Sequence, residues 1–275
     1  MNSHKRLLTL SALATVAIVA GTASTVAAAA PRHDHKAAKP TVVLVHGAFA
    51  DGSSWNKVTQ RLQAAGYRVV VPSNPLRGLQ SDSAYVANVL KSVQGPVVLV
   101  GHSYGGEVIT NAAASNPQVK ALVYIAAIAP EKGESANDIL KAYPGSELPD
   151  ALNPLPYLRP DGSTGTDLYV KPDKFPAVFA ADAPPAEARV MAAAQRPIDA
   201  SALDARSEHA AWHDVPSWYA VARNDRTIPA AAERHMAERA GAHVVEVKSS
   251  HAMAVSHPDA VTRLIEQAAQ ATAPR

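Results

Sequence analysis

The sequence contains no cysteine among its 275 residues. This absence excludes disulfide bonds, thiolate zinc sites and a cysteine nucleophile, and it leaves the redox compartment undetermined. The chain also lacks a large excess of either charge, since it has 26 lysine and arginine residues and 24 aspartate and glutamate residues. Lys5 and Arg6, in an N-terminal stretch without acidic residues, account for the difference. The neutral remainder lacks the basic face with which proteins bind nucleic acids.

Long hydrophobic runs are also scarce, and the one at residues 7–21 is short for a membrane-spanning helix, which needs about 20 residues. It follows a basic start at residues 1–6 and precedes small residues that end in four alanines at 27–30. This layout is typical of a secretory signal peptide, and an uncleaved membrane anchor is the alternative. We expect cleavage at 28–30, secretion to an extracellular or periplasmic location, and a flexible mature N-terminus at 31–40.

Apolar runs alternate with amphipathic segments along the mature chain. Hydrophobic residues make up 47% of the sequence, which is enough for a sizeable core. The predicted strands are residues 41–45, 67–71, 97–100, 119–127, 217–222 and 244–247. The predicted helices are residues 53–65, 81–93, 107–115, 230–240 and 258–271. Continuous apolar strands that alternate with helices predict an α/β fold, with a mostly parallel sheet and helices on both faces.

Residues 131–205 interrupt this alternation. No comparable apolar strand occurs there, and nine of the 21 prolines lie between Pro144 and Pro185. The alternative is a disordered linker. Five aromatic residues in this segment argue against it, because linkers rarely carry so many: Tyr143, Tyr157, Tyr169, Phe175 and Phe179. We therefore expect an inserted, mainly helical cap within a single domain that spans residues 41–275.

A glycine-rich motif carries the first candidate for chemistry. Residues 101–106 read GHSYGG and match G-x-S-x-G, with a predicted strand before the motif and a predicted helix after it. Such a sharp turn strains the backbone at the serine, and the glycines remove Cβ atoms that would clash. Ser103 is thus predicted to present its hydroxyl at the carboxyl end of the sheet. The alternative is an ordinary serine in a glycine-rich turn.

A serine nucleophile needs a base and a group that orients the base. Asp225 follows the predicted strand 217–222, and His251 follows the predicted strand 244–247. Carboxyl ends of parallel strands meet at one edge of a sheet, where Ser103 is also expected. The sequence therefore predicts a triad of Ser103, His251 and Asp225.

Other residues compete for these roles. Asp214 precedes its strand and so falls at the wrong edge, while Glu131 follows the strand at 119–127 and is the second choice for the acid. His209 and His213 have a spacing that could bind zinc, but no third ligand with suitable spacing is evident. We therefore expect no metal site.

Two backbone amides are predicted to stabilise an oxyanion. One is that of Tyr104, at the start of the helix after the serine, and the other that of Ala48, in the loop after the first strand. Gly47 would allow this loop to approach closely. Phe49 and His102 are expected near a substrate pocket, although a core aromatic and a structural histidine are the alternatives.

Four segments carry a family resemblance through their order and spacing: VLVHGA at 43–48, GHSYGG at 101–106, ARNDRTIP at 222–229 and SSHAMAV at 249–255. They resemble the α/β-hydrolase superfamily, and within it the small-esterase branch of plant methylesterases, hydroxynitrile lyases and their bacterial relatives. The resemblance covers roughly residues 41–270. It implies an α/β-hydrolase fold with a cap at about residues 131–205.

At matching positions the resemblance implies Ser103 as nucleophile, His251 as base and Asp225 as the residue that orients the base. Ala48 and Tyr104 would supply the oxyanion-binding amides, and no metal or organic cofactor is implied. Hydroxynitrile lyases of this branch carry a lysine after the catalytic histidine, where this chain has Ala252, which argues against lyase chemistry. Relatives that open epoxides or cleave carbon–halogen bonds use an aspartate nucleophile, and dienelactone-type hydrolases use cysteine.

The expected protein is a secreted serine carboxylesterase, of the EC 3.1.1 type, that forms an acyl-enzyme from small to medium esters. Its partner would be a small-molecule ester, with no nucleic acid and no membrane after signal cleavage, and it would be a monomer or a weak homodimer. Other chemistry on the same triad, such as C–C bond hydrolysis or cofactor-free perhydrolysis, is the alternative. A non-catalytic ligand-binding protein of the same fold is a third reading.

Overall fold

The computed structural model describes residues 39–272. The predicted signal peptide and residues 31–38 of the mature N-terminus lie outside the described residues. Among the helices of the described part, none is long and apolar enough to cross a membrane.

Six parallel strands form the main sheet, in the order β2-β1-β3-β4-β8-β9. The strands are β1 (Thr41–Val45), β2 (Val69–Val70), β3 (Val97–Ser103), β4 (Val119–Ala127), β8 (Ser217–Ala222) and β9 (His243–Val247). The helices around it are η1 (Gly52–Trp55), α1 (Asn56–Ala64), α2 (Leu79–Lys91), α3 (Tyr104–Ala112), η2 (Ala113–Ser115), η3 (Ala211–His213), α9 (Ala230–Arg239), α10 (Met253–Ser256) and α11 (Pro258–Ala271). This arrangement confirms the predicted α/β-hydrolase fold.

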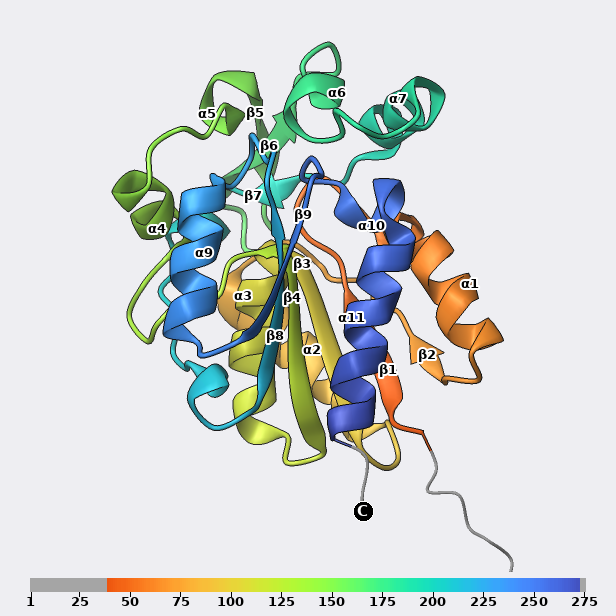
Figure 1. Cartoon of the computed structure of the whole chain (residues 1–275). Helices are drawn as coiled ribbons and strands as arrows, with labels where there is room; N and C mark the ends of the chain where they lie inside the picture. The colour runs from red at the N-terminus through yellow and green to blue at the C-terminus, as the bar shows by residue number, and fades with distance from the viewer. Residues whose placement is uncertain (1–38, 273–275) are drawn as a thin grey trace, which may run out of the picture. The chain divides into compact units, whose positions relative to one another are not determined.

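Side chains on the central strands point alternately into two cores. On β1, Val43 and Val45 pack into the core under α2, α3 and α9. Val42 and Leu44 pack into the core under α1 and α11. Figure 1 shows α1 and α11 on one side of the sheet and α3 and α9 on the other. Every residue of β1, β3 and β8 is buried, as expected for strands covered on both faces.

The ends of some elements differ from the sequence prediction. The strand expected at 67–71 shrinks to two residues because β2 is a half-buried edge strand. The strand expected at 97–100 continues to Ser103 and leads directly into α3. Because of this extension, the serine of the glycine-rich motif lies at the junction between β3 and α3.

Between β4 and β8 the chain forms an insertion beyond the carboxyl ends of the main strands (Figure 1). It contains α4 (Ala136–Ala142), α5 (Leu148–Ala151), β5 (Leu152–Leu158), β6 (Thr164–Val170), α6 (Phe175–Val178), α7 (Pro185–Ala194), β7 (Ile198–Asp199) and α8 (Ser201–Asp204). The antiparallel sheet β5-β6-β7 was not predicted. Pro154 and Pro156 argue against a strand when only the sequence is considered. They are tolerated in β5 because it is a largely exposed edge strand.

A network of polar side chains holds the small sheet of the insertion together. Asp199 accepts hydrogen bonds from the Tyr157 hydroxyl at 2.5 Å, the Arg159 guanidinium at 2.8 Å and the Ser201 hydroxyl at 2.7 Å. Burial alone would raise the pKa of Asp199, but these bonds outweigh it and hold that pKa well below its usual range. Asp199 is therefore an ionised anchor of the insertion.

Candidate active site

Ser103 occupies a strained turn between β3 and α3. Its φ is 55° and its ψ is −128°, a region that residues other than glycine rarely adopt. A Cβ on Gly105 would lie 2.6 Å from the carbonyl oxygen of Val45, and one on Gly101 would lie 2.5 Å from that of Gly105. The glycines are thus required by close backbone contacts, and the serine is held in its turn by the packing of β1, β3 and α3.

Asp225 and His251 form a buried pair in the loops after β8 and β9. Asp225 Oδ2 lies 2.6 Å from His251 Nδ1, and both side chains are fully buried. The other carboxylate oxygen, Oδ1, accepts the backbone N–H groups of Thr227 at 2.6 Å and Ile228 at 2.9 Å. Among the described residues, the Nε2 atom of His251 has no hydrogen-bond partner. The pair therefore leaves one ring nitrogen available for a proton.

The ring of His251 packs against the rings of His102 and Phe179. The ring centroids lie 4.7 Å and 4.8 Å from that of His251, respectively. His102 Nε2 lies 2.9 Å from the carbonyl oxygen of His251. Burial lowers the pKa of His102 well below its usual range, so the ring is neutral and carries its proton on Nε2, because a carbonyl oxygen can only accept. His102 thus holds the main chain of the His251 loop through this hydrogen bond.

The loop after β1 touches the serine directly. A Cβ on Gly47 would lie 2.6 Å from Ser103 Cβ and 3.3 Å from Ser103 Oγ. The backbone N–H of Ala48, the next residue, donates to no acceptor in the part of the chain that the structure describes, and the same holds for the N–H of Tyr104. The Tyr104 hydroxyl donates to Asp82 on α2 at 2.9 Å, which anchors the side chain of this residue. Two free amides accordingly flank the serine.

The sequence model described as "Alpha/beta hydrolase family" matches residues 42–264. The chain belongs to the α/β-hydrolase family.

Relatives in the family share roughly a quarter of the sequence. The chain is 27% identical over 253 residues to a pyrethroid hydrolase of Sphingobium wenxiniae, which covers 84% of this chain and 88% of the relative. It is 25% identical over 254 residues to the α/β hydrolase nvfD of Aspergillus novofumigatus, with 84% of this chain and 97% of the relative covered. The crystal structure of polyneuridine aldehyde esterase aligns with a TM-score of 0.73 and 20% identity, over 83% of this chain and 98% of that chain. These matches agree with the small-esterase branch expected from the motifs.

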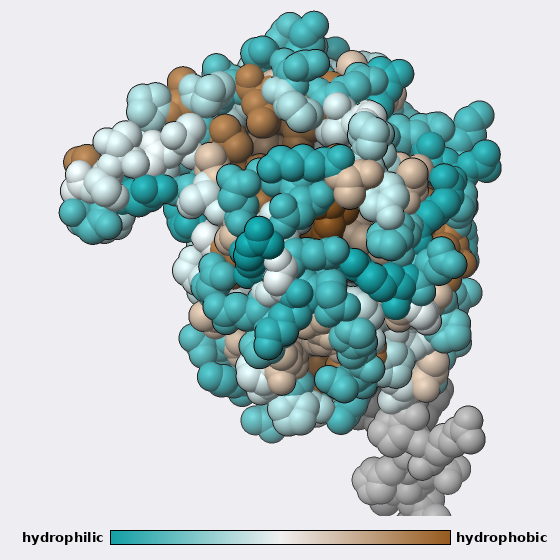
Figure 2. All heavy atoms as spheres, turned by 90° about the vertical axis from the view of Figure 1, so that its left-hand side faces the viewer, coloured by the Kyte–Doolittle hydropathy of each residue, from teal (hydrophilic) through white to brown (hydrophobic). Residues whose placement is uncertain are grey.

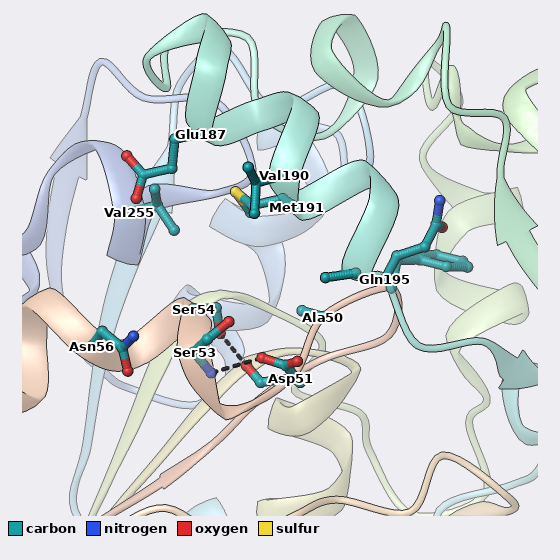
Figure 3. Close-up of a pocket in the computed structure, with 12 residues that line it drawn as sticks. Ala50, Asp51, Ser53, Ser54, Asn56, Glu187, Val190, Met191, Gln195 and Val255 are labelled. Atoms are coloured by element: carbon teal, nitrogen blue, oxygen red, sulfur yellow. Dashed lines mark hydrogen bonds between the residues drawn. The ribbon is translucent and has the colours of Figure 1, made fainter.

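A pocket of about 230 Å³ opens beside the loop after β1 (Figure 3). Its lining comes from the start of η1 and α1, from α7 of the insertion and from α10, and comprises Phe49, Ala50, Asp51, Ser53, Ser54, Asn56, Glu187, Val190, Met191, Ala194, Gln195 and Val255. A smaller cavity shares Ser54, Met191 and Val255 with it and reaches His102 and Ala252. Of the two residues expected near a pocket, Phe49 lines the larger one and His102 lines only the smaller cavity. Sequence reasoning missed Met191, because no motif marks this position on α7.

The insertion is tied to the histidine loop by Asp182. Its carboxylate accepts the backbone N–H of Ser250 at 3.1 Å and the hydroxyl of the same residue, and it lies 3.0 Å from His257 Nε2. In addition, the backbone N–H of Ala252 donates to the Phe179 carbonyl oxygen at 2.9 Å. The residues on both sides of His251 are therefore bound to the insertion.

The rival residues are placed elsewhere. Glu131 lies 3.0 Å from His213 Nε2, in an exposed pair, and Asp214 is exposed. Within residues 39–272 there is no group of three side chains that could hold a metal ion. A buried residue that sequence reasoning missed is Glu233 on α9, whose Oε2 accepts the backbone N–H of Ala222 at 3.0 Å.

Proposed function

We propose that this chain is a serine carboxylesterase, in which Ser103 is the nucleophile, His251 the base and Asp225 the residue that orients the base. The single observation that supports it best is the strained serine at the β3–α3 turn, combined with a fully buried histidine–aspartate pair whose outer nitrogen is free. The chain is similar to a pyrethroid hydrolase and to the α/β hydrolase nvfD, and these similarities favour the same reaction class.

In the proposed reaction, Ser103 Oγ attacks the ester carbonyl carbon and His251 Nε2 takes the hydroxyl proton. Asp225 accepts the Nδ1 proton of the ring, which selects the tautomer and stabilises the imidazolium. The amides of Ala48 and Tyr104 donate to the tetrahedral oxyanion, and each is worth about 3 kcal/mol of transition-state stabilisation. His251 then protonates the leaving alcohol, and water hydrolyses the acyl-enzyme by the same steps in reverse.

The pocket beside the loop after β1 supports a substrate class, although neither Ser103 nor His251 lines it. Its volume of about 230 Å³ and its mixed lining suit a small to medium acyl or alkyl group rather than a polymer. Ser103 is only 6% exposed and does not line this pocket, so the proposal includes a movement of the insertion that admits the ester. The neutral His102 and Ala252 flank His251 without adding a positive charge, which suits ester hydrolysis better than cyanide release.

The test is hydrolysis of p-nitrophenyl esters from acetate to decanoate by the wild type and Ser103→Ala side by side. Activity that disappears in a folded Ser103→Ala variant supports the mechanism, and the optimal chain length measures the pocket. Wild-type activity that survives the substitution refutes the proposed nucleophile. Secretion is part of the same proposal, and N-terminal sequencing of protein recovered outside the cytoplasm should find a start close to residue 31.

A further inference from the structure

Glu233 is a fully buried carboxyl group that the proposed mechanism does not use. It lies on α9 with no exposed surface, and no lysine or arginine forms an ion pair with it in the described chain. Oε2 accepts one backbone N–H, that of Ala222, while no donor reaches Oε1. An ionised carboxylate with an oxygen left without a donor is costly in a protein interior.

The neighbour that Glu233 does contact is Asp225. Both groups are held by the same residue, because the N–H of Ala222 donates to Glu233 and its carbonyl oxygen accepts the N–H of Asp225 at 3.2 Å. Ala222 thereby brings the carboxyl group of Glu233 and the loop that carries Asp225 together at the carboxyl end of β8. Two carboxylates in this position repel each other, and a proton on one of them turns the repulsion into a hydrogen bond.

We propose that Glu233 is a positioning residue that stays protonated and donates a hydrogen bond to Asp225, which in turn holds His251. The proton is assigned to Glu233 because the oxygens of Asp225 already act as acceptors, for two backbone amides and for the His251 ring. With Glu233 as a further donor, the lone pairs of Asp225 are nearly all occupied, and its carboxylate cannot rotate away from His251. The proposal rests on the triad assigned above.

Burial and then the charge of Asp225 raise the pKa of Glu233 well above its usual range. The other titratable groups that face it are Tyr219 on β8 and Arg234 on α9. Burial raises the pKa of Tyr219 well above its usual range, and its hydroxyl donates to the Ala127 carbonyl oxygen, so it stays neutral. Arg234 is at the surface and pairs with Glu246 of β9 at 2.7 Å. Glu233 is therefore the group of this cluster that can lose its proton in alkaline solution.

Glutamine at position 233 separates this role from simple packing. In Glu233→Gln the amide oxygen can accept from Ala222 and the amide nitrogen can donate to Asp225, so the hydrogen bond survives without a titrating proton. Glu233→Met fills the space without a donor. Glu107 on α3 offers a matched control, because it is another fully buried carboxyl group, its pKa is raised by burial, and neither of its side-chain oxygens has a hydrogen-bond partner in the described chain.

The experiment is a pH profile of kcat and KM on p-nitrophenyl butyrate for the wild type, Glu233→Gln, Glu233→Met and Glu107→Gln, with Ser103→Ala as background. We expect wild-type kcat to fall at alkaline pH, because ionised Glu233 loses its hydrogen bond and adds a negative charge beside Asp225. Glu233→Gln should keep wild-type kcat at neutral pH within about threefold and lose the alkaline decline, and Glu107→Gln should retain that decline. Glu233→Met should lose about tenfold to hundredfold in kcat with KM little changed, the range for one hydrogen bond to a charged group.

An alkaline decline that is the same in the wild type and Glu233→Gln would overturn the proposal, even if Glu233→Met fails to fold. Wild-type kcat in a folded Glu233→Met would also overturn it. Failure of the triad itself gives a different result, because Ser103→Ala would then remain active whatever occupies position 233.

Discussion

Gly47→Ala is the most direct test of how the loop after β1 serves the reaction. The added methyl carbon would lie 2.6 Å from Ser103 Cβ and 2.8 Å from the His102 carbonyl oxygen. Carbon atoms in contact normally lie about 3.5–4.0 Å apart, so the loop must retreat by roughly 1 Å. The amide of Ala48 retreats with it. Loss of one oxyanion donor lowers kcat by about 100- to 1000-fold, and a misplacement of about 1 Å has an effect at the lower end of that range.

We therefore expect Gly47→Ala to lower kcat on p-nitrophenyl butyrate about 100-fold while KM changes little. Overpacking of this kind destabilises the fold by about 1–3 kcal/mol, which chemical denaturation measures separately. Gly52→Ala is the matched control on the same segment, because its methyl meets only a side-chain methyl of Val71 at 3.1 Å, which can move. A folded Gly47→Ala enzyme with kcat within threefold of the wild type would refute the role of this loop.

Three further substitutions test other parts of the structure. Asp182→Asn should lower kcat several-fold with unchanged secondary structure, because the loop before His251 loses a charged anchor, and unchanged kcat would contradict this. Met191→Trp should raise KM for decanoate more than for acetate by filling the pocket, and equal effects on both esters would contradict the assigned pocket. Asp199 has a lowered pKa, so its stabilising effect is present above about pH 4, the unfolded value, and is lost as pH falls further. Urea unfolding should therefore show a stability gap between the wild type and Asp199→Asn that narrows below about pH 4, and a constant gap would contradict the ionised anchor.

Local motifs and topology were sufficient to predict much of the fold and the candidate residues. Ser103 could be predicted because the turn that holds it requires glycine at neighbouring positions, and these glycines are visible in the sequence. Asp225 and His251 could be predicted because parallel strands bring their carboxyl ends to one edge of the sheet. These arguments need only the order of strands, which apolar runs reveal well.

Other features depend on packing that no local pattern records. Strand β5 was missed because its prolines are compatible only with an exposed edge, and exposure is a tertiary property. Glu233 was missed because α9 looks like an ordinary surface helix, and Figure 2, which faces that side of the molecule, shows a largely hydrophilic surface. Only the structure shows that one glutamate of this helix turns inward. The lining of the pocket is likewise set by how α7 rests on the loop after β1.

The attachment of the insertion has a consequence for how new specificities can arise on this fold. The N–H of Phe49 donates to the Arg196 carbonyl oxygen at 3.1 Å, and the N–H of Ala252 donates to the Phe179 carbonyl oxygen. Both bonds use main-chain atoms only, so they do not depend on which side chains α7 carries. Side chains on α7 can therefore be exchanged, in a combinatorial library or during evolution, while these two hydrogen bonds still attach the insertion to the loops after β1 and β9. The side chains that set the substrate range can therefore change without moving the loops that carry the triad.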